Sequence, residues 1–242
     1  MKALAVFSVK GGVGKTALAV NLAHAAATLS GRRTLLWDLD AQGAATWMLR
    51  LSPRAGAKAR KGFSDGDIGS LIQTSDFPGL DVLAADRSLR HLEKQLADDD
   101  KSKRLKKILK SLEKDYDRIV LDCPPGLTEL ADQIFRAVDL LVVPMLPSPL
   151  SQRAFDQLTQ HLARDHKGGP PICPVFTMAD RRKALHRQTL ESAPDQAVIP
   201  YAAAIEAMAV SRTPVLAAGR STPAAKALRA LWTQVERTLV KP

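Results

Sequence analysis

The sequence predicts an α/β fold with a doubly wound, mostly parallel β-sheet flanked by helices. Two observations favour this fold: short runs rich in Val, Leu and Ile recur along the chain, and stretches with helical periodicity separate them. Continuous apolar runs are typical of parallel strands that are buried on both faces. Ligands of such a sheet are expected at the carboxyl ends of the strands.

The expected elements follow one another along the whole chain. Strands are predicted at residues 3–9, 34–39, 80–84, 118–121, 140–144 and 171–177. Helices are predicted at residues 15–29, 86–97, 101–113, 127–138, 150–164 and 224–240. No internal repeat and no long biased linker interrupts this alternation. We therefore expect residues 1–242 to form one domain.

One segment, residues 52–69, does not fit the alternation. It places Arg54, Lys58, Arg60 and Lys61 among Gly, Ala and Ser and offers almost nothing to bury. We expect a mobile basic loop within the domain.

Composition narrows the possible classes of protein. Lys and Arg total 35 against 25 Asp and Glu, a net charge of +10, which favours a polyanionic partner: nucleic acid, an anionic membrane or phosphorylated ligands. Two cysteines, Cys123 and Cys173, cannot form a disulfide framework, and no Cys or His pairing suits an iron–sulfur or zinc centre. Gly11 and Gly12 interrupt the apolar start before a signal peptide could form, so we expect a cytoplasmic protein.

The strongest motif lies directly between the first expected strand and an Ala-rich helix. It consists of Lys10, Gly11, Gly12, Val13, Gly14, Lys15 and Thr16. Glycines let successive N–H groups point at phosphate oxygens, and the helix N-terminus adds positive potential. In a phosphate loop (P-loop) of this kind the lysine, here Lys15, reaches the β- and γ-phosphates, and the hydroxyl, here that of Thr16, binds Mg²⁺. The sequence therefore predicts a P-loop NTPase.

The loop departs from the strict motif, because Val9 stands where Gly is required and Lys10 adds a second lysine. This form resembles the deviant Walker A loop of the ParA/MinD family of ATPases, which the chain resembles from end to end. The resemblance implies ATP and Mg²⁺ as cofactors and an ATP-dependent homodimer, in which Lys10 reaches the nucleotide of the other subunit. Ala17 replaces the family's second threonine at a nucleotide-binding position.

Two acidic motifs follow the second and fourth expected strands. Asp38 and Asp40 resemble the Asp-x-Asp element of the family, with Ala41 and Ala44 in place of its Pro and Asn. The resemblance implies that Asp40 orients the attacking water and that Asp38 supports the metal or its water shell. Asp122 fits the Walker B position, which holds Mg²⁺ through a water.

The turn after Asp122 contains Pro124, Pro125 and Gly126, and it resembles the family's second switch. Cys123 is interpreted as a small packed residue, since no basic neighbour in the sequence would activate its thiol.

Two later segments resemble the parts of the family that border the adenine base. Met178 lies at the end of one expected strand, and Pro200 lies in Val198-Ile199-Pro200-Tyr201. Ala202 stands where the family has an asparagine, so the expectation of ATP rather than GTP depends on the resemblance.

The chain from residue 181 onward holds ten Lys and Arg against four acids. In ParA proteins the ATP-bound dimer uses basic residues of this half of the chain to hold DNA without sequence preference. The candidates here are Arg181, Arg182, Lys183, Arg187 and Arg212. Few aromatic residues accompany them, which favours salt-dependent phosphate contacts over base stacking. Because the first strand starts near residue 3, any DNA binding must come from the ATPase fold itself.

A MinD-like membrane-associated positioning ATPase is the alternative. The last expected helix has a basic amphipathic pattern, but we interpret its apolar face, Leu228, Leu231, Trp232, Val235 and Leu239, as packed on the sheet. The chain ends two residues after this helix, so we do not expect membrane binding. The lysine-rich residues 101–110 are likewise interpreted as an ordinary amphipathic helix.

The resemblance implies a cytoplasmic, nucleoid-associated ATPase whose slow hydrolysis is stimulated by a ParB-like protein or a cargo adaptor. Family members segregate plasmids or chromosomes, or they space protein assemblies over the nucleoid. The sequence does not choose among these cargoes.

Overall fold

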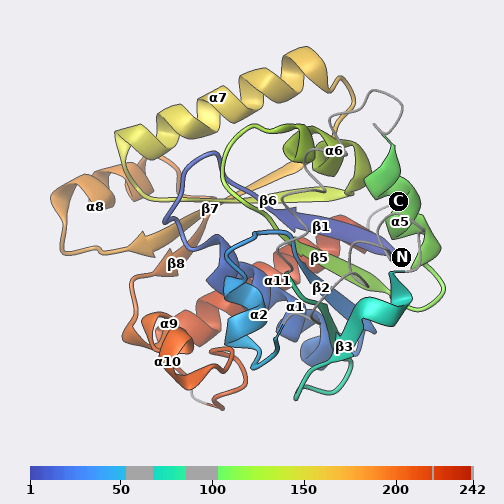
Figure 1. The fold of residues 1–242 in the computed structure, drawn as a ribbon. Helices are drawn as coiled ribbons and strands as arrows, with labels where there is room; N and C mark the ends of the chain where they lie inside the picture. Colours follow the sequence, from blue (N-terminus) through green and yellow to red (C-terminus); the bar gives the residue numbers. More distant parts are fainter. Residues whose placement is uncertain (53–67, 86–102, 220, 241–242) are drawn as a thin grey trace.

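The fold is described from a computed structural model, which places residues 1–52, 68–85, 103–219 and 221–240. Its centre is an eight-stranded sheet with the order β3-β4-β2-β5-β1-β6-β7-β8 (Figure 1). All neighbouring pairs are parallel except β3 with β4, which are antiparallel. The strands are β1 Lys2–Val6, β2 Thr34–Asp38, β3 Ile72–Thr74, β4 Leu80–Leu83, β5 Arg118–Asp122, β6 Leu140–Met145, β7 Ile172–Ala179 and β8 Ala197–Pro200.

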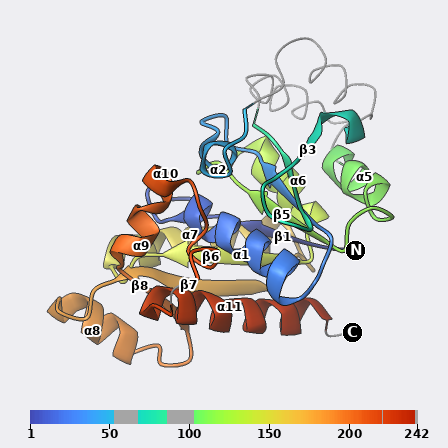
Figure 2. The ribbon, with the colours of Figure 1, turned by 90° about the horizontal axis from the view of Figure 1, so that it is seen from below.

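Helices cover both faces of the sheet. The described helices are α1 Lys15–Leu29, α2 Ala44–Met48, α5 Arg104–Ser111, α6 Glu129–Ala137, α7 Pro149–Asp165, α8 Ala184–Glu191, α9 Ala203–Glu206, α10 Met208–Ser211 and α11 Pro223–Val240, with a 3-10 turn at Gly69–Leu71. Helices α5, α6 and α7 pack on one face, whereas α1 and α11 lie side by side on the other (Figures 1 and 2). The doubly wound arrangement predicted from the alternation is confirmed.

Strand β1 shows why the sheet needs helices on both sides. Its residues alternate between the two cores: Ala3 and Ala5 face α6 and α7, while Leu4 and Val6 face α1 and α11. All four are fully buried. Burial of apolar area on both faces, at about 25 cal/mol per Å², is the main stabilising contribution to this central strand.

The six predicted strands are present, with ends shifted by one to three residues. Helix α1 has the predicted bounds, and the helices predicted at 127–138, 150–164 and 224–240 correspond to α6, α7 and α11. The helix predicted at 86–97 lies outside the described residues. Strands β3 and β8 and helices α2, α8, α9 and α10 were not predicted as elements, because their three to eight residues are too short to show a clear period.

Two amphipathic helices behave as the sequence indicates. Helix α5 buries Leu105, Ile108 and Leu109 and carries its lysines outside. Helix α11 buries the predicted apolar face against the sheet, and Trp232 Nε1 donates a hydrogen bond to Ser30 Oγ at 2.8 Å. Among the described residues, no helix is long and apolar enough to cross a bilayer.

The predicted basic loop at 52–69 falls largely outside the described residues. For the end of this segment the prediction is wrong. Ile68 is only 1% exposed and lies in the core, and Gly69 begins the 3-10 turn. An apolar side chain anchors the end of the segment, which the basic composition did not indicate.

Candidate active site

The carboxyl ends of β1, β2 and β5 bring the three predicted motifs together. These strands are neighbours, and Asp122 lies in register with Asp38 on β2 and with Val6 on β1. The phosphate loop follows β1, so residues from three distant parts of the chain meet at one edge of the sheet. This is where a doubly wound sheet binds ligands.

The loop between β1 and α1 has the conformation that its glycines allow. Gly12 and Gly14 have φ angles of 71° and 82°, a left-handed region that favours glycine. A side chain at Gly12 would meet no atom within 4 Å, so the loop leaves open space on that side. Gly14 is the N-cap of α1, and no side chain caps the helix. The first N–H groups of α1 are therefore available to an anion.

Lys15 begins α1 and is only 7% exposed. Its Nζ lies 3.5 Å from the carbonyl oxygen of Lys10, the residue that opens the loop. Burial lowers the pKa of Lys15, while the nearby charges of Asp122 and Asp40 oppose that shift. The ammonium is thus held among acidic groups, at the place where a phosphate would supply further negative charge.

Asp122 is the least satisfied polar residue of this edge. Its side chain is completely buried, and in the described part of the chain neither carboxylate oxygen has a well-formed hydrogen bond, so that the nearby Thr16 hydroxyl compensates it only in part. Burial raises its pKa well above the usual range, and the neighbouring charge of Asp38 adds to this, whereas Thr16 and Lys15 oppose the shift. A buried carboxylate without donors is costly unless a cation or a proton compensates it. Together with the Thr16 hydroxyl it forms the hard oxygen donor set that Mg²⁺ prefers, so these residues fit that ion.

Asp38 has a different environment, although it is equally buried. Its Oδ2 accepts hydrogen bonds from the backbone N–H of Thr46 at 2.9 Å and from the Thr46 hydroxyl at 2.8 Å. Its Oδ1 accepts one from the backbone N–H of Asp40 at 3.2 Å. Burial nevertheless raises the pKa of Asp38 to about 6. Oδ1 can accept one further hydrogen bond, which is what support of a metal's water shell would require.

Asp40 lies in the exposed turn after β2. Its Oδ1 accepts a hydrogen bond from Gln42 N at 2.9 Å, and its carbonyl accepts one from Gly43 N. Gly43 has a φ of 66° and is the N-cap of the short helix α2. The second carboxylate oxygen of Asp40 has no hydrogen-bond or ion-pair partner among the described residues, so it is available to a water, the role that the family resemblance implies.

Two threonines that the sequence did not single out hold this edge in place. The Thr46 hydroxyl donates to Asp38 and accepts from the backbone N–H of Ala85 at 2.9 Å, which joins α2 to the end of β4. Thr177 Oγ1 donates to the carbonyl of Val13 at 2.8 Å and so ties the phosphate loop to β7. A lone threonine carries no spacing signal, so neither role could be found from the sequence.

The expected base-binding residues lie next to the loop. A bulge in β7 gives Met178 a φ of 51°, and its Cε lies 3.6 Å from where a Cβ on Gly14 would be. Met178 lines a small apolar cavity of about 30 Å³ together with Ala17 and Ile199. Pro200 lies in register with Ala179 at the end of β8. The structure thus brings Met178 and Pro200 to the side of the loop opposite Asp40.

Four of the five basic candidates gather at the turn between β7 and α8. Arg182 makes a two-pronged contact with Asp180, Nε to Oδ1 and Nη2 to Oδ2, both 2.9 Å. Arg187 donates to the carbonyls of Arg181 and Arg182. In the described part of the chain, the side chains of Arg181 and Lys183 have no hydrogen-bond or ion-pair partner, and both are exposed.

Arg212, the fifth candidate, is not part of that cluster. It ends α10, where its Nε donates to the carbonyl of Trp47 at 2.7 Å and its guanidinium lies 4.1 Å from the centre of the Trp47 ring. Arg50 donates to the carbonyl of Ser211 at 3.2 Å. These contacts join α10 to α2.

Sequence and structure comparisons agree with the geometry. The family model for the AAA domain matches residues 1–168. The sporulation initiation inhibitor protein Soj of Bacillus subtilis (strain 168) is 32% identical over 197 residues, which cover 78% of each chain. The chromosome partitioning protein ParA of Caulobacter vibrioides (strain NA1000 / CB15N) is 31% identical over 198 residues, 78% of this chain and 73% of that protein.

Among solved structures, the septum site-determining protein MinD of Pyrococcus horikoshii OT3, complexed with Mg-ADP, has the same fold. The TM-score is 0.80 at 22% identity, over 98% of this chain and 96% of that one.

The parallel sheet, the phosphate loop and the acidic carboxyl edge define a P-loop NTPase. The relatives then place it more narrowly: the chain belongs to the ParA/MinD family of P-loop ATPases, and within that family it is Soj-like. The cofactors of this family are ATP and Mg²⁺.

Proposed function

We propose that this chain is a ParA-type ATPase, which binds ATP and Mg²⁺ in a sandwich of two subunits, holds DNA in that state and releases it on hydrolysis. The observation that carries the nucleotide site is the buried carboxylate of Asp122, without hydrogen-bond donors, beside Lys15 and Thr16. Binding of nucleotide with Mg²⁺ would compensate the charge of this carboxylate and so stabilise the folded protein.

The residues at the carboxyl edge take the following roles in the proposal. The backbone N–H groups of the loop, from Gly11 to Ala17, would bind the phosphates, and Lys15 would neutralise charge on the β- and γ-phosphates. Thr16 and Asp122 hold Mg²⁺, which supplies charge neutralisation on the phosphates. Asp38 would support the ion or its water shell, since its Oδ1 accepts only one hydrogen bond from the described residues.

Two further residues act in hydrolysis itself. Asp40 orients the water that attacks the γ-phosphorus, so that ADP and phosphate are released. Lys10 extends to the nucleotide of the partner subunit, where its charge stabilises the transition state only when two subunits have met. A cation supplied in this way by an arginine finger contributes about 10³ to 10⁵ in rate. Met178 and Pro200 border the adenine.

DNA binding is assigned to the turn between β7 and α8. Arg181 and Lys183 extend from it without a side-chain partner among the described residues, and Arg182 and Arg187 belong to the same turn and the start of α8. Phosphate contacts of this kind are independent of base sequence and weaken with salt. Arg212, although predicted with this group, packs on Trp47, so its contribution to DNA is expected to be smaller.

The ATP-bound state contains the γ-phosphate and the ADP-bound state does not. Contacts to this group supply the free-energy difference between the two states of the switch. A nucleoid-associated, cytoplasmic protein with this cycle segregates or positions cargo. The cargo is a plasmid, a chromosome or a protein cluster, and a ParB-like protein or adaptor stimulates the slow hydrolysis. Chromosome partitioning by the Caulobacter relative supports the proposal.

The decisive experiment is a titration of nonspecific duplex DNA with purified protein in ATP, in ADP and without nucleotide, across a salt series. The proposal expects binding only in ATP, with an affinity that falls steeply as salt rises. Binding that is independent of nucleotide, or that is absent in all three states, contradicts it. In the latter case anionic liposomes test the MinD-like alternative, although the buried apolar face of α11 does not favour membrane insertion.

Two variants test nucleotide binding and ATP hydrolysis separately. Lys15→Ala should lose nucleotide binding, and Asp40→Ala should retain the ATP-bound dimer on DNA because hydrolysis stops. Normal hydrolysis in either variant contradicts the site assignment.

Matched double variants test the DNA surface. Arg181→Ala with Lys183→Ala should weaken DNA binding at least tenfold and reduce its salt dependence. Lys226→Ala with Arg229→Ala removes the same charge from the exposed side of α11 and should have much less effect.

A further inference from the structure

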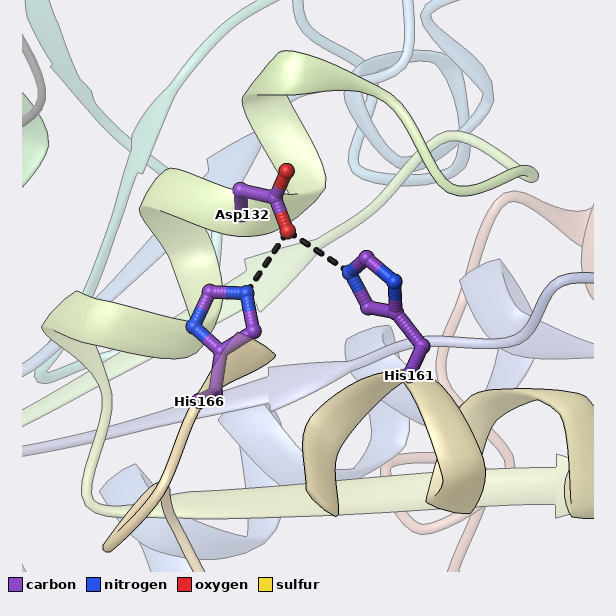
Figure 3. A group of neighbouring side chains, drawn as sticks. All are labelled: Asp132, His161 and His166. Carbon is purple, nitrogen blue, oxygen red and sulfur yellow. Dashed lines mark hydrogen bonds and ion pairs between the residues drawn. The ribbon is translucent and has the colours of Figure 1, made fainter. Parts of the chain in front are cut away.

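A second cluster of titratable side chains lies on the outer layer formed by α6 and α7, apart from the nucleotide edge (Figure 3). Asp132 is on α6, His161 is near the end of α7, and His166 is the residue that follows that helix. The Nε2 atoms of both histidines point at the same carboxylate oxygen, Oδ1 of Asp132, at 2.8 Å for His161 and 2.7 Å for His166. The potential ligand atoms of the three residues lie within 4.8 Å of one another.

The other ring nitrogen of His161 also faces a carboxylate. Its Nδ1 lies 3.1 Å from Oδ2 of Asp165, so an acceptor stands on each side of the imidazole. A neutral imidazole carries one N–H and can satisfy only one of them. The second contact requires either an added proton or a cation between Nε2 and Asp132.

We propose that a divalent transition-metal ion, with Zn²⁺ as the best match, occupies the space between His161 Nε2, His166 Nε2 and the Asp132 carboxylate. Two imidazole nitrogens, one carboxylate oxygen and a water form a tetrahedral set that suits Zn²⁺. Bonds of about 2.0–2.1 Å place tetrahedral ligands about 3.3 Å apart, so the side chains must separate by about half an ångström. Asp132 is partly exposed and can make that movement.

The surroundings supply what a metal-binding histidine needs. With Nε2 on the ion, the proton of His161 would lie on Nδ1, which is 3.1 Å from Oδ2 of Asp165, and a carboxylate in such a position can orient a metal-bound histidine. Asp165 is itself held by Arg164 through contacts of 2.7–3.0 Å.

The second histidine is fixed by packing and can still be reached from solvent. The His166 side chain is only 3% exposed and packs edge-on against Phe135. A surface groove of about 720 Å³ reaches Asp165 and His166, so this side of the cluster is open to solvent. The ion would join α6 to the end of α7 and therefore act as a structural clip.

The test uses the nucleotide-free full-length chain after treatment with a chelator, so that its result does not depend on the proposed ATPase cycle. ZnCl₂ is titrated in competition with a chromophoric chelator, and Co²⁺ is titrated in parallel and followed by visible absorption. We expect one Zn²⁺ per chain with a Kd below about 1 μM, and the intense absorption of tetrahedral Co²⁺. Absence of binding, or the weak absorption of six-coordinate Co²⁺ alone, overturns the proposal.

Variants locate the ion. His166→Gln and Asp132→Asn should each weaken Zn²⁺ binding more than 100-fold, and Asp165→Asn should weaken it about 10-fold to 100-fold. His186→Gln removes an imidazole from α8 and should leave the Kd unchanged. Equal binding by the cluster variants and the wild type overturns the assignment.

NMR of the wild type keeps the proposal falsifiable if a variant fails to fold. Bound Zn²⁺ must shift the Nε2 resonances of His161 and His166. A doubly protonated His161 that does not respond to Zn²⁺ shows that a proton, not a metal, satisfies the two carboxylates.

Discussion

Strands β2 and β5 end in aspartates that lie side by side in register, and the two carboxylates have opposite surroundings. Both are fully buried, yet Asp38 accepts three hydrogen bonds from its own chain, whereas neither oxygen of Asp122 has a well-formed hydrogen bond to the described residues. The difference teaches that burial alone does not identify a ligand-binding acid. Asp38 is joined to Thr46 and organises the loop, whereas Asp122 has acceptor capacity that only a ligand can use.

The largest expected effect separates these roles directly. Asp122→Ala should reduce ATP hydrolysis about 10²- to 10³-fold, since it removes a charged group on which the site depends. In chelator, its free energy of unfolding should not fall, because alanine removes a buried carboxylate that has no well-formed hydrogen bond to compensate it. Phosphate release and urea unfolding measure the two quantities. Hydrolysis within fivefold of the wild type would remove Asp122 from the metal site.

The second test uses pH to compare the two acids without nucleotide or Mg²⁺. Burial raises the pKa of Asp38 to about 6, so between about pH 4 and pH 6 the folded state keeps a proton that the unfolded state releases. The contribution of Asp38 to the free energy of unfolding therefore falls as pH rises through this range, by about 3 kcal/mol at 1.36 kcal/mol per pH unit.

Burial shifts the pKa of Asp122 in the same direction, so the slope of the wild type alone does not isolate Asp38. Urea unfolding at pH 4, 5, 6 and 7 of the wild type and of Asp38→Asn gives the difference. Equal slopes in the two proteins would show that Asp38 does not hold this proton.

A smaller effect should follow from Thr46→Val, which keeps the shape of the side chain and removes its hydroxyl. Asp38 Oδ2 and the N–H of Ala85 each lose a partner, so the free energy of unfolding should fall by about 2 kcal/mol. Thr189→Val is the matched control, because its exposed hydroxyl bonds only to the carbonyl of Leu185 within α8. Its effect should stay below about 0.5 kcal/mol. Equal losses in both variants would contradict the linking role of Thr46.

The smallest expected effect concerns the other anchor of the edge. Thr177→Val removes the hydrogen bond to the Val13 carbonyl and should weaken ATP binding by up to about tenfold, at about 1 kcal/mol per lost bond. Fluorescent ATP-analogue titration measures the change. Unaltered affinity would show that the phosphate loop keeps its shape without β7.

The sequence predicts the parts of this molecule that depend on local pattern. The Lys10–Thr16 spacing and the acids at strand ends identify the nucleotide edge, and the Ala-rich run that follows the loop places α1 with correct bounds. Contacts between distant residues could not be predicted in this way. Asp132 and His161 are 29 positions apart and meet only because α6 and α7 pack together.

Short elements whose residues show no helical or strand periodicity could not be predicted from the sequence either. Helix α2 has five residues and begins after Gly43, which has a left-handed conformation. Its start therefore lacks the Ser, Thr, Asp or Asn cap by which a helix start is recognised in a sequence. Arg212 was grouped with the DNA-binding candidates because of its charge. The packing of α10 on α2 instead stacks its guanidinium on the Trp47 ring.

The contact between Arg212 and Trp47 allows the intrinsic tryptophan fluorescence of the protein to report on the position of α2. Trp37 and Trp232 are at most 2% exposed, whereas Trp47 is 56% exposed and lies on α2, directly after the turn that holds Asp40. Its emission must lie to the red of the other two, and its intensity depends on the cation stacked on its ring. Any movement of α2 away from α10 changes that emission, so stopped-flow fluorescence of the unlabelled protein can time the motion of this turn during a single turnover.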